Sequence, residues 1–214
     1  MRTYVTPIGF NSTSVTRPVL SHGIDTDDRV VLVRPKEETD DSRATEAIDD
    51  VRRLLAEVEP DVALSVERVP HDDFETSVLR CRDLLRQAEG KLIVNLGGGA
   101  RDVFLPFTTA VLGEVSRVDQ TLFFSDIDGR VRELELPRLG VTISDSVRET
   151  LAVTAEKGGE STIPELTEST NRSKSTIARH VELLQANDAV EAHREGKIKH
   201  VALTLTGRLL GDSA

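Results

Sequence analysis

The chain has 214 residues, of which 38% are apolar, an ordinary value for a folded protein with a hydrophobic core. Its formal net charge at pH 7 is −10, and only six of its 27 basic residues are lysines. We expect no membrane span because there is no long apolar run, and no secretory signal because the opening MRTYVTPIGF lacks an apolar core. The single cysteine, Cys81, cannot form an internal disulfide, so we expect a cytoplasmic protein.

An acid excess with few lysines is typical of proteins from halophiles, since high salt screens the self-repulsion of such a surface. We therefore expect a halophilic source, and an ordinary acidic protein is the alternative. On the halophilic interpretation, the negative net charge does not exclude nucleic acid as a partner.

Residues 1–136 alternate between strand and helix patterns. The expected strands, in chain order, are at 3–8, 29–34, 62–69, 91–96, 121–125 and 131–136, the last two joined by an Asp-Gly turn. Helices are expected at 42–59, 72–88 and 101–115, with a weaker helical pattern at 12–22 that Pro18 interrupts. This alternation predicts an α/β Rossmann-like domain, with a parallel sheet covered by helices on both faces.

The pattern changes after PRLG at 137–140, which looks like a hinge. Helices are expected at 145–156 and 163–169, and a third from a cap at Ser173 to about residue 187. Two alternating strands follow at 189–194 and 198–204. This order predicts a winged helix-turn-helix. We assign residues 1–137 to the first domain, 138–142 to the hinge and 143–214 to the second domain.

Residues 95–103 read NLGGGARDV and place three glycines and an arginine between a strand and a helix. Glycines let a ligand approach the main chain, a helix N-terminus attracts anions, and Arg101 can bind phosphate bidentately. These features predict an anion pocket, with a tight strand-to-helix turn as the alternative. The loop lacks the GK[ST] ending of a Walker A motif and the third glycine of GxGxxG, where Asp102 stands, so ATP hydrolysis and NAD binding are disfavoured.

In a doubly wound sheet, the first strand would lie beside the strand that precedes the glycines. The crevice between these two strands would bring together residues 7–11 and 96–101. We expect a phosphate-bearing ligand there that is bound but not turned over.

The predicted helix after Ser173 is the recognition helix of a helix-turn-helix, and its first residues are hydroxyls and cations that suit DNA contacts. Residues 172–199 contain six basic and four acidic residues, a local positive balance in a negative chain. The candidate DNA-binding residues are Arg172, Ser173, Lys174, Ser175, Thr176, Arg179, His180, Lys197 and Lys199. A winged helix used only for protein contacts is the alternative.

The YVTPIGF opening, the GGGAR loop and the domain order together resemble the archaeal CRISPR-associated transcriptional regulators, which join an N-terminal CARF domain to a C-terminal winged helix. The resemblance covers nearly the whole chain. It implies a dimer that binds a cyclic oligoadenylate, such as cyclic tetra-adenylate, across its two-fold axis. The ligand-binding residues that it implies are Pro7, Ile8, Gly9, Phe10, Leu96, Gly97, Gly98, Gly99, Ala100 and Arg101. This chain has Ala100 where the family often has threonine, so one hydroxyl contact is missing.

The resemblance thus implies a homodimeric, ligand-responsive regulator of CRISPR-associated genes in antiviral defence, with double-stranded DNA and cyclic oligoadenylate as partners and no membrane. We expect no catalytic residue, metal or cofactor, because the histidines lack metal-ligand spacing and no GxSxG motif is present. A ring nuclease that positions a ribose 2′-hydroxyl is one alternative, assisted by Thr6, Asn11, Ser12 and Arg101. A regulator of another phosphorylated metabolite is the third hypothesis.

Overall fold

The computed structural model describes residues 1–37 and 41–211. These residues form two compact units, and the chain passes from the first to the second between Glu135 and Leu136. Within the described residues, the helices are too short or too polar to cross a membrane.

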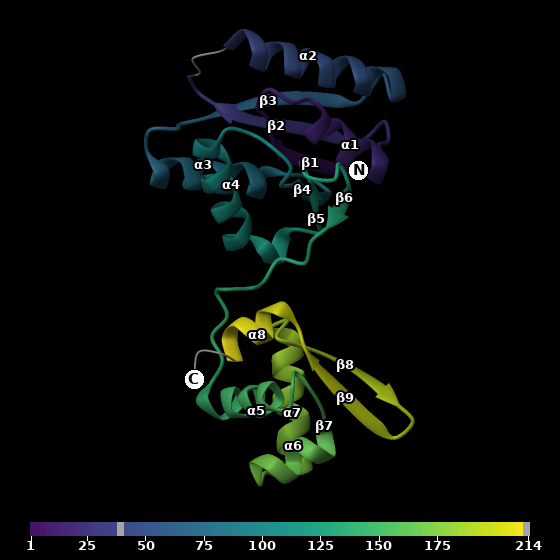
Figure 1. Ribbon diagram of the computed structural model, residues 1–214, viewed down its shortest axis with the longest axis vertical. Coiled ribbons are helices and arrows are strands. Elements are labelled where there is room, and N and C mark those ends of the chain that lie inside the picture. The colour runs from purple at the N-terminus through teal and green to yellow at the C-terminus, as the bar shows by residue number, and fades with distance from the viewer. Residues whose placement is uncertain (38–40, 212–214) are drawn as a thin grey trace. The chain divides into compact units, whose positions relative to one another are not determined.

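The first unit contains a six-stranded sheet of order β3-β2-β1-β4-β5-β6 (Figure 1). Its strands are β1 Arg2–Pro7, β2 Arg29–Pro35, β3 Ala63–Val69, β4 Lys91–Asn95, β5 Gln120–Phe124 and β6 Val131–Glu133. The first five are parallel, and β6 pairs antiparallel with β5. Because β1 pairs with both β2 and β4, the predicted doubly wound order is confirmed and the chain direction reverses between β1 and β4.

Four α-helices cover this sheet, and Figure 1 shows α2 on one side of it and α3 and α4 on the other. They are α1 Thr13–His22, α2 Asp41–Val58, α3 Phe74–Gln87 and α4 Arg101–Gly113, followed by a 3-10 turn, η1, at Val115–Arg117. Helices α1 and α2 share one apolar core with the strands, made of Tyr4, Ile8, Val15, Val19, Val30, Leu32, Ala47, Ile48, Val51, Leu55, Ile93 and Leu122. The pattern at 12–22 is therefore a true helix although Pro18 lies inside it.

Two apolar residues at helix ends are exposed although their spacing predicts burial. Phe74 is 52% exposed because it is the first residue of α3, which Asp73 caps by accepting a hydrogen bond from the N–H of Thr76. Val58 is 57% exposed at the end of α2. Cys81, by contrast, lies in the core, and this burial raises the pKa of its thiol to about 12.

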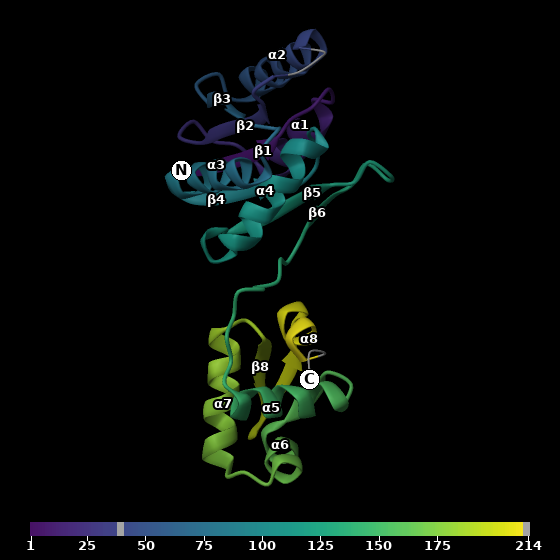
Figure 2. The same cartoon turned by 90° about the vertical axis from the view of Figure 1, so that its left-hand side faces the viewer.

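The second unit is a winged helix-turn-helix, as predicted (Figure 2). Its elements are α5 Asp145–Glu156, β7 Glu160–Thr162, α6 Ile163–Thr170, α7 Lys174–Ala186, β8 Val190–Glu195, β9 Ile198–Leu203 and α8 Leu205–Gly211. The three strands form an antiparallel sheet of order β7-β9-β8. The core consists of Ile143, Val147, Leu151, Ile163, Leu166, Ile177, Val181, Leu184, Ala189, Val190, Val201 and Leu203. The short elements β7 and α8 are not predicted, because neither is long enough to show a period.

The predicted hinge at 138–142 is partly fixed to the second unit. The N–H of Arg138 donates to Oγ1 of Thr206 at 3.0 Å, and Ile143 is only 6% exposed in the core. Arg138 therefore belongs to the second unit, and a flexible link between the two units would have to lie before this residue.

A buried ion pair fixes the start of the first unit. The Asp28 carboxylate is 1% exposed and accepts hydrogen bonds from the N–H and the Nε of Arg2 and from the N–H of Asp25. Burial alone would raise the pKa of Asp28, but the hydrogen bonds from Arg2 and Asp25 outweigh it and lower that pKa below its ordinary value. The pair therefore stabilises the fold only while Asp28 is ionised.

We expect Asp28→Asn to lower the free energy of unfolding at pH 7 by about 3 kcal/mol, because Arg2 and the N–H of Asp25 lose the buried carboxylate that accepts their hydrogen bonds. Since the folded pKa of Asp28 is depressed, its contribution is complete above the unfolded pKa and is lost as pH falls through the folded one. In denaturant titrations, the difference from wild type should therefore shrink below about pH 4.

The matched control is Asp25→Asn, which removes a carboxylate that is 83% exposed and contacts the same arginine. It should cost less than about 1 kcal/mol. This account would be contradicted if both variants lost the same free energy of unfolding, or if the loss in Asp28→Asn did not change with pH.

Candidate functional site

Two loops meet at the carboxyl ends of β1 and β4. The glycine loop, residues 96–100, follows β4, and the β1–α1 loop comprises residues 8–12. A Cβ on Gly9 would lie 3.5 Å from the Cα of Gly99, and a Cβ on Gly99 would lie 2.6 Å from the Cβ of Pro7. The structure thus brings together the two segments that the doubly wound order predicts.

Each of the three glycines is closely packed. A Cβ on Gly97 would lie 2.8 Å from the Cβ of Phe124, and one on Gly98 would lie 2.5 Å from the Oγ of Ser14. Gly99 also has a φ of +103°, which other residues rarely adopt. Packing alone therefore explains the glycines, and the case for a ligand has to rest on the surrounding groups.

A pocket of about 350 Å³ lies beside the glycine loop. Its lining residues are Gly9, Phe10, Asn11, Ser14, Gly97, Gly98, Gly99, Ala100 and Asp126. Six of these are predicted ligand-binding residues. Ser14 and Asp126 are missed, because α1 and the turn after β5 reach the pocket only through the tertiary fold.

Four predicted ligand-binding residues, Pro7, Ile8, Leu96 and Arg101, do not line this pocket. The side chains of Ile8 and Leu96 are 2% and 6% exposed and belong to the core, so a ligand would have to contact these two residues through their backbone. Apolar residues at the ends of parallel strands are held by the same burial as the strands themselves.

Arg101 is the first residue of α4 and is exposed. Among the described residues, no acidic group pairs with its guanidinium. The residue before it, Ala100, offers no side-chain cap, so the first N–H groups of α4 have no side-chain acceptor. A free cation and uncapped N–H groups together make the start of α4 suitable for an anion.

A buried amide joins three elements beneath this loop. The Nδ2 of Asn95, which is 1% exposed, donates to the Oγ1 of Thr6 at 2.9 Å and to the carbonyl of Ser14 at 2.8 Å. The Ser14 carbonyl lacks its helical donor because Pro18 has no N–H. The Oδ1 of Asn95 accepts no hydrogen bond from the described residues.

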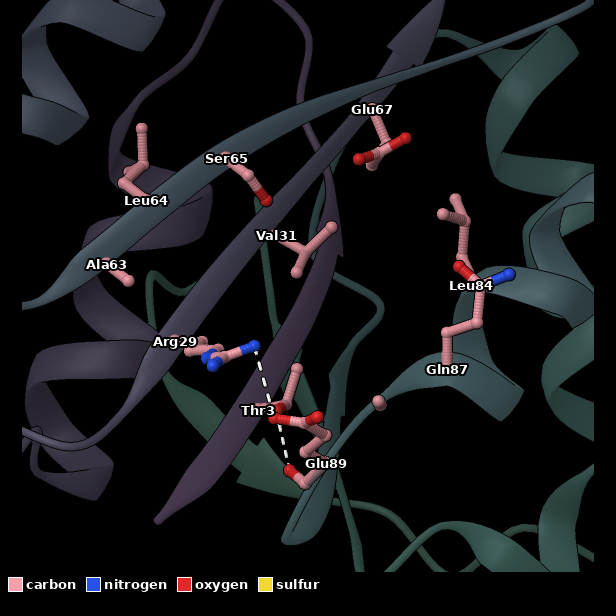
Figure 3. A pocket seen from close by; sticks show the side chains of 11 residues that line it. Thr3, Arg29, Val31, Ala63, Leu64, Ser65, Glu67, Leu84, Gln87 and Glu89 are labelled. Carbon is pink, nitrogen blue, oxygen red and sulfur yellow. Dashed lines mark hydrogen bonds and ion pairs between the residues drawn. The ribbon is translucent and has the colours of Figure 1, made fainter.

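Another pocket, of about 320 Å³, lies at the amino ends of β1, β2 and β3 (Figure 3). There Nη1 of Arg29 pairs with Oε2 of Glu89 at 3.2 Å, and Oγ1 of Thr3 donates to the carbonyl of Glu89 at 2.7 Å. Because Arg29 of this second pocket already pairs with Glu89, an anion would have to displace a carboxylate to bind there. The glycine loop is therefore the better candidate site for an anionic ligand.

In the second unit, α7 presents a polar first turn. Its cap, Ser173, accepts a hydrogen bond from the N–H of Thr176 at 3.2 Å. Lys174, Ser175 and Arg179 are exposed. Neither Lys174 nor Arg179 forms an ion pair with another described residue. These two cations, with the exposed Lys197 between β8 and β9, are therefore available for phosphate or base contacts.

The predicted DNA contact of His180 is wrong, and the side chains of Arg172 and Lys199 already bind other residues of the chain. His180 is 3% exposed with its Nδ1 2.8 Å from the Oγ1 of Thr150, and burial lowers the pKa of its imidazole. Its spacing from Ile177 and Leu184 places it on the buried face of α7. Arg172 pairs with Glu149, and Nζ of Lys199 donates to Oε1 of Gln185.

Within residues 1–37 and 41–211, no group of three or more histidine, cysteine or acidic side chains is arranged to hold a metal ion.

The fold defines a class of chain in which a Rossmann-like α/β domain precedes a winged helix-turn-helix. Residues 2–137 match the family described as the Csa3 CRISPR-associated Rossmann-like domain. This match covers more than half of the sequence, and the chain belongs to that family. The resemblance inferred from the sequence is confirmed for this domain, whereas an archaeal source stays a prediction.

Among solved structures, Enterococcus italicus Csm6 bound to cyclic hexa-2′-fluoro-hexa-dAMP matches with a TM-score of 0.52 and 12% identity, over 88% of this chain and 52% of that one. This likeness shows a shared fold. Streptococcus pneumoniae FabT in complex with DNA matches with a TM-score of 0.31 and 22% identity, over 33% of this chain and 50% of that one.

Protein VC1899 from Vibrio cholerae matches with a TM-score of 0.46 and 9% identity, over 99% of this chain and 64% of that one. The chain spans 50% to 59% of the length of the first three structures that it matches. No curated protein matches the chain.

We expect Gly97→Ala to lower the free energy of unfolding by about 1–3 kcal/mol, because the new methyl group would overlap Phe124 and Asn95. Gly113→Ala is the matched control, since a Cβ at Gly113 would meet nothing within 4 Å. Chemical denaturation should show little change for the control. Equal stability of both variants would mean that the glycine loop is not held by this packing.

Proposed function

We propose that the chain is a ligand-responsive, DNA-binding transcriptional regulator of CRISPR-associated genes that senses a cyclic oligoadenylate. One observation carries the proposal: the same chain has unpaired cations at two separate sites suited to anions. Arg101 stands at the uncapped start of α4, and Lys174 and Arg179 stand on the first turns of α7. Membership of the Csa3 family and the cyclic ligand named for the Csm6 structure support the choice of ligand.

The size of the glycine-loop pocket favours a ligand shared between two copies of the chain. A volume of about 350 Å³ is at the lower end of the range for a drug-sized ligand. A ring of four nucleotides is several times larger than such a ligand. A homodimer with two glycine loops facing each other would present two pockets and two copies of Arg101 to one ring.

The winged helix-turn-helix would bind double-stranded DNA with the first turns of α7 in the major groove and Lys197 near the backbone. In a dimer, the two copies of α7 would contact two half-sites. Ligand would favour one arrangement of the two halves by no more than its differential affinity for the alternatives. Because Arg138 is fixed to the second unit, residues just before it would transmit this change.

We expect binding without cleavage. Thr6, a candidate helper in ring cleavage, is fully buried and accepts the hydrogen bond from Asn95. The Oδ1 of Asn11 is engaged by the N–H of Thr13 at 3.0 Å. Of the four residues named for the ring nuclease, Arg101 has the charge to stabilise a phosphate, and it would need a further group to activate the nucleophile.

Saturating cyclic tetra-adenylate should raise the Tm of the purified protein, and Arg101→Ala should remove most of this shift because the start of α4 loses its free cation. At a hundred times Kd, linkage gives about 2.7 kcal/mol, or about 5–10 °C for a chain of this size. Thermal unfolding with cyclic and linear tetra-adenylate measures the effect. Arg179→Ala is the matched control and should keep the full shift.

No shift with the cyclic ligand would contradict the proposed ligand. Conversion of the ring to linear product by the wild type, lost in Arg101→Ala, would instead identify an enzyme.

Lys174→Ala and Arg179→Ala should each weaken DNA binding about ten- to a hundredfold, the usual effect of losing one base-contacting cation. Fluorescence anisotropy with a labelled duplex from the region upstream of the chain's own gene measures this affinity. Arg101→Ala serves here as the control and should bind the duplex like wild type without ligand. Unchanged affinity in both α7 variants would show that α7 does not contact DNA.

A further inference from the structure

The pocket at the glycine loop contains an acidic side chain. Of its described lining residues, Asp126 is the one that carries a charge. A carboxylate accepts hydrogen bonds but cannot donate them, and it repels phosphate. A pocket built for a simple anion would not be expected to contain one, so Asp126 needs a different explanation.

Asp126 belongs to a turn whose backbone is well defined. The turn joins β5 to β6, and Figure 2 shows it projecting from the edge of the sheet. The N–H of Ser125 donates to the carbonyl of Arg130 at 3.0 Å, and Nη1 of Arg17 on α1 donates to the carbonyl of Gly129 at 3.1 Å. These bonds fix the turn both to itself and to α1, so Asp126 keeps its position at the pocket.

The two acidic residues of this turn differ in what they contact. Asp128 accepts a hydrogen bond from the N–H of Arg130 at 3.1 Å and pairs with the guanidinium of Arg132. No hydrogen bond or ion pair with another described residue engages the carboxylate of Asp126. It is therefore free to accept a hydrogen bond from a bound molecule.

We infer that Asp126 is a specificity-determining residue that accepts a hydrogen bond from the nucleoside part of the ligand, either a ribose 2′-hydroxyl or the exocyclic amine of adenine. This inference rests on the proposed function. The ligand's phosphates would lie toward Arg101 and the start of α4, and its donor group would lie at Asp126. The pocket would then select a nucleotide over an anion that lacks such a donor.

The test uses calorimetric titration of the full chain with three probes: cyclic tetra-adenylate, its 2′-deoxy counterpart, and cyclic tetra-inosinate, which lacks the amine. Wild type should bind one of the two analogues at least about tenfold more weakly than cyclic tetra-adenylate, as expected for loss of a hydrogen bond to a charged group. Asp126→Ala should bind cyclic tetra-adenylate about tenfold more weakly and no longer discriminate against that analogue.

Two further variants keep the result interpretable. Glu133→Ala removes an exposed acid from the same hairpin outside the pocket lining and should bind all three probes like wild type. Asp126→Asn keeps the size and one acceptor oxygen, and its affinity should fall between those of wild type and Asp126→Ala. The Tm of each variant without ligand shows whether the fold is retained.

If Asp126 acted only through its charge, Asp126→Ala should bind every probe more tightly than wild type does, because removing a carboxylate near phosphates removes a repulsion. Tighter binding of all three probes by Asp126→Ala, or equal binding of all three by wild type, would overturn this inference and leave the proposed function standing. Failure of wild type to bind cyclic tetra-adenylate would overturn both.

Discussion

The close approach of α1 to the end of β4 is the constraint on which the candidate site depends. Pro18 cannot donate to the Ser14 carbonyl, and the buried amide of Asn95 takes the place of the missing helical donor at 2.8 Å. Because the same amide also donates to Thr6, one side chain joins β1, α1 and β4. This arrangement leaves no room for a side chain at Gly97, which explains why the chain turns there on glycines.

The tight packing beneath the loop also shapes what a ligand would meet. The three glycines are held by Phe124, Ser14 and Pro7, so the loop backbone is fixed by the protein itself rather than by a bound molecule. A site whose groups are already in place loses less conformational entropy on binding. The Oδ1 of Asn95 has no donor among residues 1–37 and 41–211, and a buried acceptor left in this way destabilises a fold by about 1–3 kcal/mol.

The sequence predicts features that follow from local periodicity and misses those that depend on tertiary contacts. The parallel sheet and the winged helix-turn-helix follow from the spacing of apolar residues, and the reversal of chain direction beside the glycines follows once a doubly wound strand order is assumed for that sheet. The position of Asp126 depends on β5 pairing with β4, and the pairing of Arg172 with Glu149 joins two helices, so neither can be read from a local pattern. His180 is different, since its spacing from Ile177 and Leu184 already places it on the buried face.

Pairing of charges, rather than net charge, decides where this acidic chain can bind anions. Arginines such as Arg29 and Arg86 lie against carboxylates, so the field of each is largely cancelled nearby. Arg101 and Lys174 have no such partner among the described residues, and each is the first residue of a helix, where backbone N–H groups add to its positive field. The acidic surface repels anions elsewhere, so it would direct them toward these positions. A formal charge of −10 is therefore compatible with binding both a nucleotide and DNA.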